Sequence, residues 1–152
     1  MKLDNIDKKL LGLLQTDSKQ TTKQLSLQLG LSVTAVYERI KKLEKEKVIK
    51  QYVALVNKNK IEKSFLVFCH VQLEKHNKDH IAVFEKEVNR LEEVTECFHV
   101  SGDYDYILKV YVKDMDAYRD FIVNKLTALK HVGNTRSVFT IDEVKNSIAI
   151  AL

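Results

Sequence analysis

Basic and hydroxyl-bearing residues concentrate between positions 32 and 50, in a pattern suited to contact with a polyanion. Six Lys and Arg side chains fall within the twelve residues from 39 to 50 and are offset by only two glutamates. Long cationic side chains neutralise phosphates, and neighbouring hydroxyl groups can bond to phosphates or base edges. The candidate DNA-binding residues are Ser32, Thr34, Tyr37, Glu38, Arg39, Lys41, Lys42 and Lys45. A lysine-rich face that is merely solvated is the alternative.

A second group of polar residues surrounds the sequence Val100-Ser101-Gly102-Asp103-Tyr104-Asp105. The amides of a tight turn can face a ligand, and its two carboxylates can receive an ammonium group. Thr135 and Ser137 supply hydroxyls farther along the chain. Gly-Asp is equally good hairpin chemistry without any ligand. The residue types alone therefore leave both interpretations open.

The other reactive side chains form no catalytic or metal-binding motif. The chain has five scattered histidines: His70, His76, His80, His99 and His131. His76 and His80 share helical spacing but lack the H-E-x-x-H context of a zinc enzyme, and neither a G-x-S-x-G elbow nor a P-loop is present. Cys69 and Cys97 lie in apolar runs, so we expect two buried free thiols. The sequence predicts no enzyme, no cofactor and no metal.

Charge is divided unevenly along the chain. Residues 1–60 contain 13 Lys and Arg against 6 Asp and Glu, a net charge of +7, whereas residues 61–152 contain 12 against 15, a net charge of −3. This asymmetry is expected when one half meets a polyanion and the other does not. No long uncharged apolar run suggests a membrane span, and the first residues lack the apolar core of a secretory leader. We expect a cytoplasmic, nucleoid-associated protein.

Two helices are expected before the basic residues. The first covers about residues 5–15 after Asp4 as N-cap. The second is opened by Thr21 and Gln24, which have capping-box spacing, and it ends at Gly30, which suits a left-handed C-cap.

A third helix, about residues 33–45 after Ser32 as N-cap, is expected to carry the basic residues on its outer face. Its buried stripe is predicted to be Val33, Val36, Ile40 and Leu43. Two helices joined by a short turn that contains Gly form a helix-turn-helix, which places its second helix in the major groove. Residues 47–56 alternate enough to predict one or two strands, as a small wing or a tether.

Residues 64–152 read as strand, helix, strand, strand, helix, strand. Strands are expected at 65–73, 94–101, 104–112 and 134–144, and 148–152 could add an edge strand. Asn77 or Asp79 caps the first helix, with an apolar stripe of Ile81, Phe84, Val88 and Leu91. Asp114 caps the second, with a stripe of Met115, Tyr118, Ile122, Leu126 and Leu129.

This order predicts a ferredoxin-like βαββαβ domain with both helices on one face of an antiparallel sheet. The bare, substantially apolar face should be buried against a second copy, which predicts a homodimer. The fold class is α+β, with a winged-type helix-turn-helix domain at residues 1–50, a strand or linker at 51–63, and the ferredoxin-like effector-binding and oligomerisation domain at 64–152.

The N-terminal residues resemble the DNA-binding domain of the leucine-responsive/asparagine regulator (Lrp/AsnC) family. The matching positions are Leu3-Asp4-x-x-Asp7-x-x-Leu10-Leu11, Leu25-x-x-x-Leu29-Gly30-Leu31-Ser32-x-Thr34-x-Val36-x-x-Arg39-Ile40-x-x-Leu43-Glu44 and Val48-Ile49. The chain departs from the family pattern at Lys47, where Gly is usual, and in residues 57–63, which lack the usual Pro and Gly.

The C-terminal half is similar to the regulation domain of the same family. The matching positions are Val100-x-Gly102-x-x-Asp105, Leu108, Asp114, Leu126, Val132, Thr135-x-Ser137 and Val144-Lys145. The resemblance implies that an amino acid binds between dimers near the Gly-x-x-Asp turn and that dimers assemble into octamers. The effector-site residues that it implies are Gly102, Asp103, Tyr104, Asp105, Thr135 and Ser137.

The sequence therefore predicts a transcriptional regulator that binds double-stranded DNA and responds to an amino acid. Two alternatives stay open. A sirohaem-decarboxylase-like enzyme would share the resemblance in both domains, but would not need the positive charge concentrated in the N-terminal half. An intracellular amino-acid sensor would bind a ligand without retaining DNA.

Overall fold

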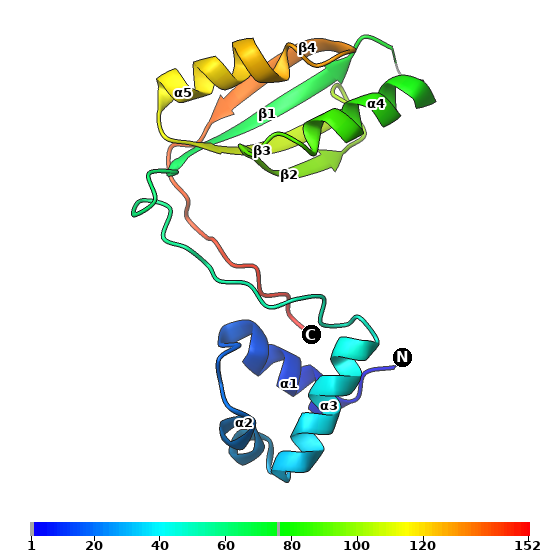
Figure 1. The fold of residues 1–152 in the computed structure, drawn as a ribbon, viewed down its shortest axis with the longest axis vertical. Coiled ribbons are helices and arrows are strands. Elements are labelled where there is room, and N and C mark those ends of the chain that lie inside the picture. Colours follow the sequence, from blue (N-terminus) through cyan, green and yellow to red (C-terminus); the bar gives the residue numbers. More distant parts are fainter. Residues whose placement is uncertain (1, 76) are drawn as a thin grey trace. The chain divides into compact units, whose positions relative to one another are not determined.

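The computed structural model describes residues 2–75 and 77–152. The chain divides into two compact units (Figure 1). The helix-turn-helix unit comprises Met1–Leu55 together with Val144–Leu152, and the sheet unit comprises Val56–Glu143. The chain thus runs from the first unit into the second and then returns.

The three N-terminal helices begin and end where their capping residues predict. They are α1 (Asn5–Thr16), α2 (Thr22–Leu29) and α3 (Val33–Lys45). Asp4 and Thr21 both form complete capping boxes, and the Ser32 hydroxyl accepts from the backbone N–H of Ala35. Gly30 ends α2 with φ of 65°, the left-handed conformation that glycine adopts without strain.

A small leucine-rich core holds these helices together. It consists of Leu10, Leu11, Leu25, Val36 and Leu43, with Ile40 partly buried beside them. The prediction that Val33 belongs to the buried stripe was wrong, because this side chain is 47% exposed. Val33 is the first residue of α3 and precedes the buried Val36 by almost one turn.

Helix α3 ends in a Schellman motif at Lys47. The Val48 N–H donates to the Leu43 carbonyl at 3.0 Å and the Lys47 N–H to the Glu44 carbonyl at 3.1 Å. Lys47 itself has φ of 58°. A side chain in the left-handed region costs free energy that glycine does not pay, so the departure from the family pattern at Lys47 carries local strain.

Replacing Lys47 with Gly is therefore expected to stabilise the helix-turn-helix unit by about 1 kcal/mol. Urea unfolding measures the change. Lys42→Gly, in the regular part of α3, is the matched control and should destabilise by about 1 kcal/mol, because glycine loses more backbone freedom in a helix. Equal destabilisation by both substitutions would contradict the assignment of strain to Lys47.

The predicted strands at residues 47–56 were wrong, and with them the wing. Among the described residues, 46–64 contain no strand and consist of turns and extended coil. The side chains of Tyr52, Val53, Leu55 and Val56 are about half exposed or more. Alternation of apolar residues does not make a strand unless a second strand pairs with it and a core covers one face.

The sheet unit has the predicted ferredoxin-like topology. Its elements are β1 (Phe65–Leu73), α4 (Lys78–Val88), β2 (Val94–His99), β3 (Tyr106–Val112), α5 (Met115–Asp120), η1 (Phe121–Leu126) and β4 (Val132–Phe139). The strand order is β2-β3-β1-β4, and every neighbouring pair is antiparallel. Asn77 and Asp114 cap α4 and α5.

Both helices cover the same sheet face (Figure 1). Phe84 and Val88 of α4 pack with Tyr118 of α5 against the inward residues of β1 and β3. Cys69 is buried in this core and Cys97 is partly buried; both thiols are free, and burial raises the pKa of each to about 11.

The second helix departs from regular α geometry halfway along. Beyond Asp120 it continues as the π-helical turn η1. Phe121 lies in the core beside Tyr118 and Leu126, and Ile122 is partly buried and packs against the same core. Met115, also predicted in the stripe, is 50% exposed. A period of 3.6 residues cannot anticipate a π turn, so the predicted stripe omitted Phe121 and wrongly included Met115, whereas Tyr118, Ile122, Leu126 and Leu129 do face the core.

The last strand is shorter than predicted. β4 ends at Phe139, and among the described residues 140–152 contain no strand. The predicted edge strand at 148–152 was therefore wrong.

Candidate nucleic-acid interface and effector site

The outer face of α3 presents the predicted DNA-binding residues together. Thr34, Tyr37, Glu38, Lys41, Lys42 and Lys45 are all exposed. They recur at spacings of three and four, so they share the side of the helix opposite the buried Val36 and Leu43. The Lys41 ammonium lies 5.7 Å from the centre of the Tyr37 ring. Ser32, at the start of the helix, already uses its hydroxyl as the N-cap.

Arg39 has a different environment from the lysines. Its Nη1 lies 2.8 Å from Asp4 Oδ2 and 2.6 Å from Asp7 Oδ1. The Asp7 side chain is 5% exposed, whereas that of Arg39 is 29% exposed. A backbone hydrogen bond from Asp7 and a side-chain bond from Arg39 hold the pKa of Asp4 below its usual value, and the bonds to Asp4 and Asp7 raise that of Arg39. Arg39 thus joins α3 to the start of α1.

Replacing Arg39 with Ala is expected to lower the free energy of unfolding by about 2 kcal/mol, because it strands the buried Asp7 carboxylate. Urea unfolding tests this. Asp7→Asn in the Arg39→Ala background removes the stranded charge and should restore part of the loss. An unchanged unfolding midpoint, together with a weaker salt dependence of DNA binding, would instead make Arg39 a phosphate ligand only.

Glu44 ties the end of α3 to the following coil. Its Oε1 accepts from the Tyr52 hydroxyl at 3.1 Å, and its Oε2 lies 3.0 Å from Lys41 Nζ. This ion pair is exposed and worth little, so Lys41 can exchange Glu44 for a phosphate. For Lys42 and Lys45, the described residues offer no comparable ion pair.

The second predicted site centres on the turn between β2 and β3. Gly102 has φ of 133°, a conformation that side chains avoid, and it is exposed together with Asp103. The Tyr104 ring stands edge-on to His70 with centroids 5.2 Å apart. The turn therefore sits at the end of the sheet and is free to face solvent or a ligand.

Asp105 fastens this turn to β1. Its N–H donates to the Val71 carbonyl at 2.9 Å, and its Oδ2 accepts from the Leu73 N–H at 2.8 Å. At least one oxygen of this carboxylate is therefore used within the chain. The structure thus gives Asp105 a positioning role for Gly102, Asp103 and Tyr104.

Thr135 and Ser137 lie on β4, on the other side of β1. Thr135 is the register partner of Val71, so Thr135 and Asp105 flank the same β1 residue. Ser137 is paired with Cys69, two positions farther from the turn, and its hydroxyl lies 2.5 Å from that of Tyr118. Thr135 and Ser137 are two residues apart on β4 and therefore share the sheet face that α5 covers, and β1 separates both from the turn.

Within residues 2–75 and 77–152, no cluster of three or more His, Cys, Asp or Glu could hold a metal ion. His80 stacks on His131 with centroids 3.6 Å apart; His76, its predicted helical neighbour, lies outside the described residues. No helix in the described part of the chain is long and apolar enough to cross a membrane.

Two features of the sites could not be found from the sequence. The spacing of Asp4 and Asp7 predicts a helix start, but not that Arg39, 32 residues beyond Asp7, completes the ion pair. The anchoring of Asp105 to β1 depends on the pairing of β1 with β3, which brings it to Leu73, 32 residues away in the sequence.

Family models match both halves of the chain. Residues 3–44 match the AsnC-type helix-turn-helix domain, and residues 66–150 match the Lrp/AsnC ligand binding domain. The leucine-responsive regulatory protein of Escherichia coli K12 is 41% identical over 145 residues, which cover 95% of this chain and 88% of that protein.

Solved structures show the same likeness. A transcriptional regulator from Neisseria meningitidis, solved as a complex with L-methionine, superposes with a TM-score of 0.94 at 30% identity, covering 98% of this chain and 96% of that one. An AsnC family transcriptional regulator from Agrobacterium tumefaciens gives a TM-score of 0.93 at 31% identity, covering 97% and 96%.

Proposed function

The chain belongs to the Lrp/AsnC family of transcriptional regulators, and we propose that it reads duplex DNA with the outer face of α3 while an amino acid bound to the sheet unit modulates that reading. It is a DNA-binding regulator rather than an enzyme, so the sirohaem-decarboxylase alternative is set aside. The observation that carries the DNA-binding surface is the exposed row of Thr34, Tyr37, Lys41, Lys42 and Lys45 opposite the helix core.

The contacts divide by chemistry. Lys41, Lys42 and Lys45 extend toward phosphates, which fixes affinity and orientation. Thr34, Tyr37 and Glu38, nearer the start of α3, reach base edges, which gives sequence preference. Arg39 contributes mainly by holding α3 on α1, and the guanidinium nitrogens that do not bond to Asp4 and Asp7 contact the DNA phosphates. A protein with these contacts works in the cytoplasm, at the nucleoid.

The effector is an amino acid at the turn 100–105 together with Thr135 and Ser137. The turn supplies amides and the Asp103 carboxylate for the two charged groups of an amino acid, and the Neisseria relative was solved with L-methionine. Such an effector shifts DNA binding only by its differential affinity for two states, typically by about 5- to 150-fold. No cofactor is needed for this.

A homodimer forms through the sheet face that the helices leave bare, and dimers assemble further into octamers. This face carries Phe68, Ile107, Phe98 and Val138 among polar neighbours, and the last two are 49% and 44% exposed. It is mixed rather than uniformly apolar, which suits a specific interface.

Phe98→Asp should dissociate the dimer, as measured by sedimentation, because it places a charge in the interface. Val123→Asp, on the exposed side of η1, is the control and should leave the dimer intact. If the Phe98→Asp variant stays dimeric, this face is not the interface.

Selection of genomic fragments by the purified protein, with and without the proteinogenic amino acids, tests the function. We expect a set of enriched fragments with pseudo-palindromic half-sites whose occupancy changes with at least one amino acid. Amino-acid binding without any retained fragment would instead support the sensor that does not bind DNA.

A further inference from the structure

The C-terminal segment, residues 144–152, contacts helix α1 within the helix-turn-helix unit. The Ile150 N–H donates to Gln15 Oε1 at 2.8 Å, and Gln15 Nε2 donates to the Ile150 carbonyl at 3.0 Å. The Gln15 amide thus bonds to both the N–H and the carbonyl of one residue, as two directly opposed residues do in an antiparallel sheet. The contact is made by the backbone, because the Ile150 side chain stays 72% exposed.

Helix α1 and this segment together line a shallow groove of about 450 Å³. Lys8, Gly12 and Gln15 line it at helical spacings of four and three, together with Lys9, and the chain segment Ala149–Leu152 lines it from the other side. Two hydrogen bonds at an exposed surface with little apolar burial make a weak contact, which can open and close readily.

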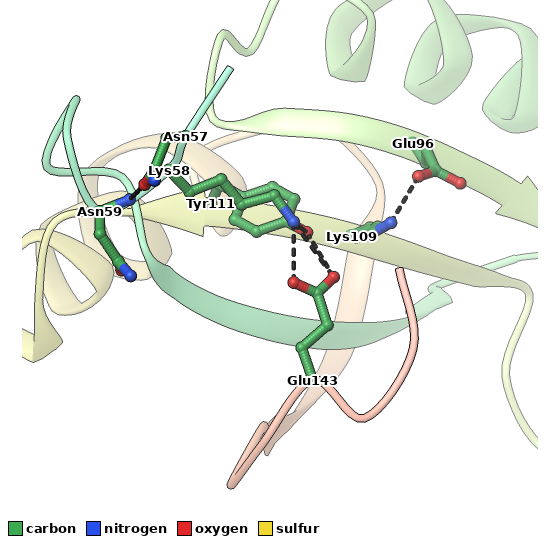
Figure 2. A network of polar contacts seen from close by, with 7 residues as sticks. All are labelled: Asn57, Lys58, Asn59, Glu96, Lys109, Tyr111 and Glu143. Atoms are coloured by element: carbon green, nitrogen blue, oxygen red, sulfur yellow. Dashed lines mark hydrogen bonds and ion pairs between the residues drawn. The ribbon is translucent and has the colours of Figure 1, made fainter. Parts of the chain in front are cut away.

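The two segments that join the units are fastened to the sheet unit by one cation (Figure 2). Lys58 Nζ, from the segment that enters the sheet unit, lies 2.6 Å from Tyr111 Oη of β3 and 3.0 Å from Glu143 Oε2, where the chain leaves it. Burial alone would lower the pKa of Lys58, but its bonds to Tyr111 and Glu143 outweigh this and raise it. Lys58 therefore stays charged and holds both segments at Tyr111.

The two connections have similar lengths between their fixed points. The first runs from Tyr52, held by Glu44, to Lys58, and the second runs from Glu143 to Ile150, held by Gln15. At full extension they span about 20 Å and about 24 Å. A single connection of this length lets the two units rotate freely about it. Two connections allow only those movements in which neither segment is stretched beyond its full length.

We propose that the Gln15 face of α1 is the docking surface for the chain's own C-terminal segment, and that this docking acts as a second tether that transmits the effector state to the helix-turn-helix unit. Resting on the proposed function, the transmission follows from chain continuity: β4 carries Thr135 and Ser137 and ends at Phe139, and residues 140–143 lead from it through the anchor at Glu143 to the segment. Displacement of β4 by a bound effector pulls on the segment and shifts the balance between docked and released forms.

Hydrogen exchange of the full-length protein tests the docking without any DNA. The Ile150 amide should exchange about fivefold more slowly than in a Gln15→Ala variant, which removes its acceptor. Gln15→Glu keeps the acceptor but loses the donor to the carbonyl, so it should lie between them. Gln28→Ala, on α2, is the matched control and should leave Ile150 unchanged. Equal Ile150 exchange in the native protein and Gln15→Ala would overturn the docking.

Transmission is tested by the effector ratio, which is the affinity for DNA with the active amino acid divided by the affinity without it. L-leucine and L-methionine are the first amino acids used. In Gln15→Ala the ratio should fall toward one, while the salt dependence of DNA binding stays native because α3 is untouched. A native ratio in a variant whose Ile150 protection is lost would overturn the transmission. Failure of the native protein to bind DNA would instead refute the proposed function, and the exchange experiment would still decide the docking.

The shared anchor provides an independent test by charge exchange. Lys58→Glu and Glu143→Lys alone each place like charges together, so each should reduce the effector ratio. The double variant restores an opposite pair and should recover most of it. Reduction in both single variants without recovery in the double would show that the Lys58–Glu143 pair does not provide the anchor.

Discussion

Replacement of Lys41 and Lys42 together by Ala should weaken binding to every duplex by about 10- to 100-fold at 0.1 M salt and reduce the slope of log K against log salt by up to about 1.8. Each lysine that neutralises a phosphate releases a counterion on binding, so its removal lowers both quantities. Fluorescence anisotropy of a labelled duplex at several salt concentrations measures them. Relative preference among duplex sequences should change little, because the base-reading residues Thr34, Tyr37 and Glu38 remain.

The matched control removes the same charge elsewhere. Lys86→Ala with Lys130→Ala takes two exposed lysines from the sheet unit and should leave the slope unchanged. If the Lys41 and Lys42 variant keeps the native slope, these lysines do not contact DNA. If both variants lose affinity equally, net charge rather than the α3 face governs binding.

Replacement of Gly102 by Val should abolish the response to the amino acid while DNA binding itself is kept. A Cβ at this position would meet no heavy atom within 4 Å, so the substitution causes no clash within the chain. The substitution acts on the backbone: at the Gly102 φ of 133°, a β-branched residue is strained by about 1–3 kcal/mol. The turn relieves this strain by changing shape, which moves its amides and Asp103 away from the effector.

The experiment compares DNA affinity with and without the effector in Gly102→Val and in Ser101→Val. Ser101 is exposed in the same turn and should tolerate the change. The anchor of Asp105 on Val71 and Leu73 should keep the sheet folded in both variants, as near-native unfolding would show. A normal effector response in Gly102→Val would refute the site at this turn.

The helices of the first unit were predictable because their ends are fixed locally. Asp4, Thr21 and Ser32 each cap a helix through a hydroxyl or carboxylate within three residues, and Gly30 supplies the left-handed C-cap. The alternating β3 strand was similarly visible, because its buried residues recur every second position. Local rules of this kind act within a few residues and can be read along the chain.

The features that were missed depend on partners distant in sequence. Residues 47–56 alternate but have no pairing strand, so the predicted wing is absent. The π turn at Phe121–Leu126 places Phe121 in the core in addition to Ile122, and the helical period did not predict this. Arg39 resembles the lysines by charge, yet the buried Asp7 across the helix interface uses its guanidinium. Gln15 and Ile150 are 135 positions apart.

Binding of duplex phosphates by α3 should appear in a titration of a labelled duplex with the protein at salt concentrations from about 50 to 200 mM. We expect saturable binding whose affinity falls linearly with salt concentration on a log–log plot, and an amino acid that shifts this line. If the protein does not bind the duplex at about 50 mM salt, with or without each amino acid, α3 is not a DNA-binding surface.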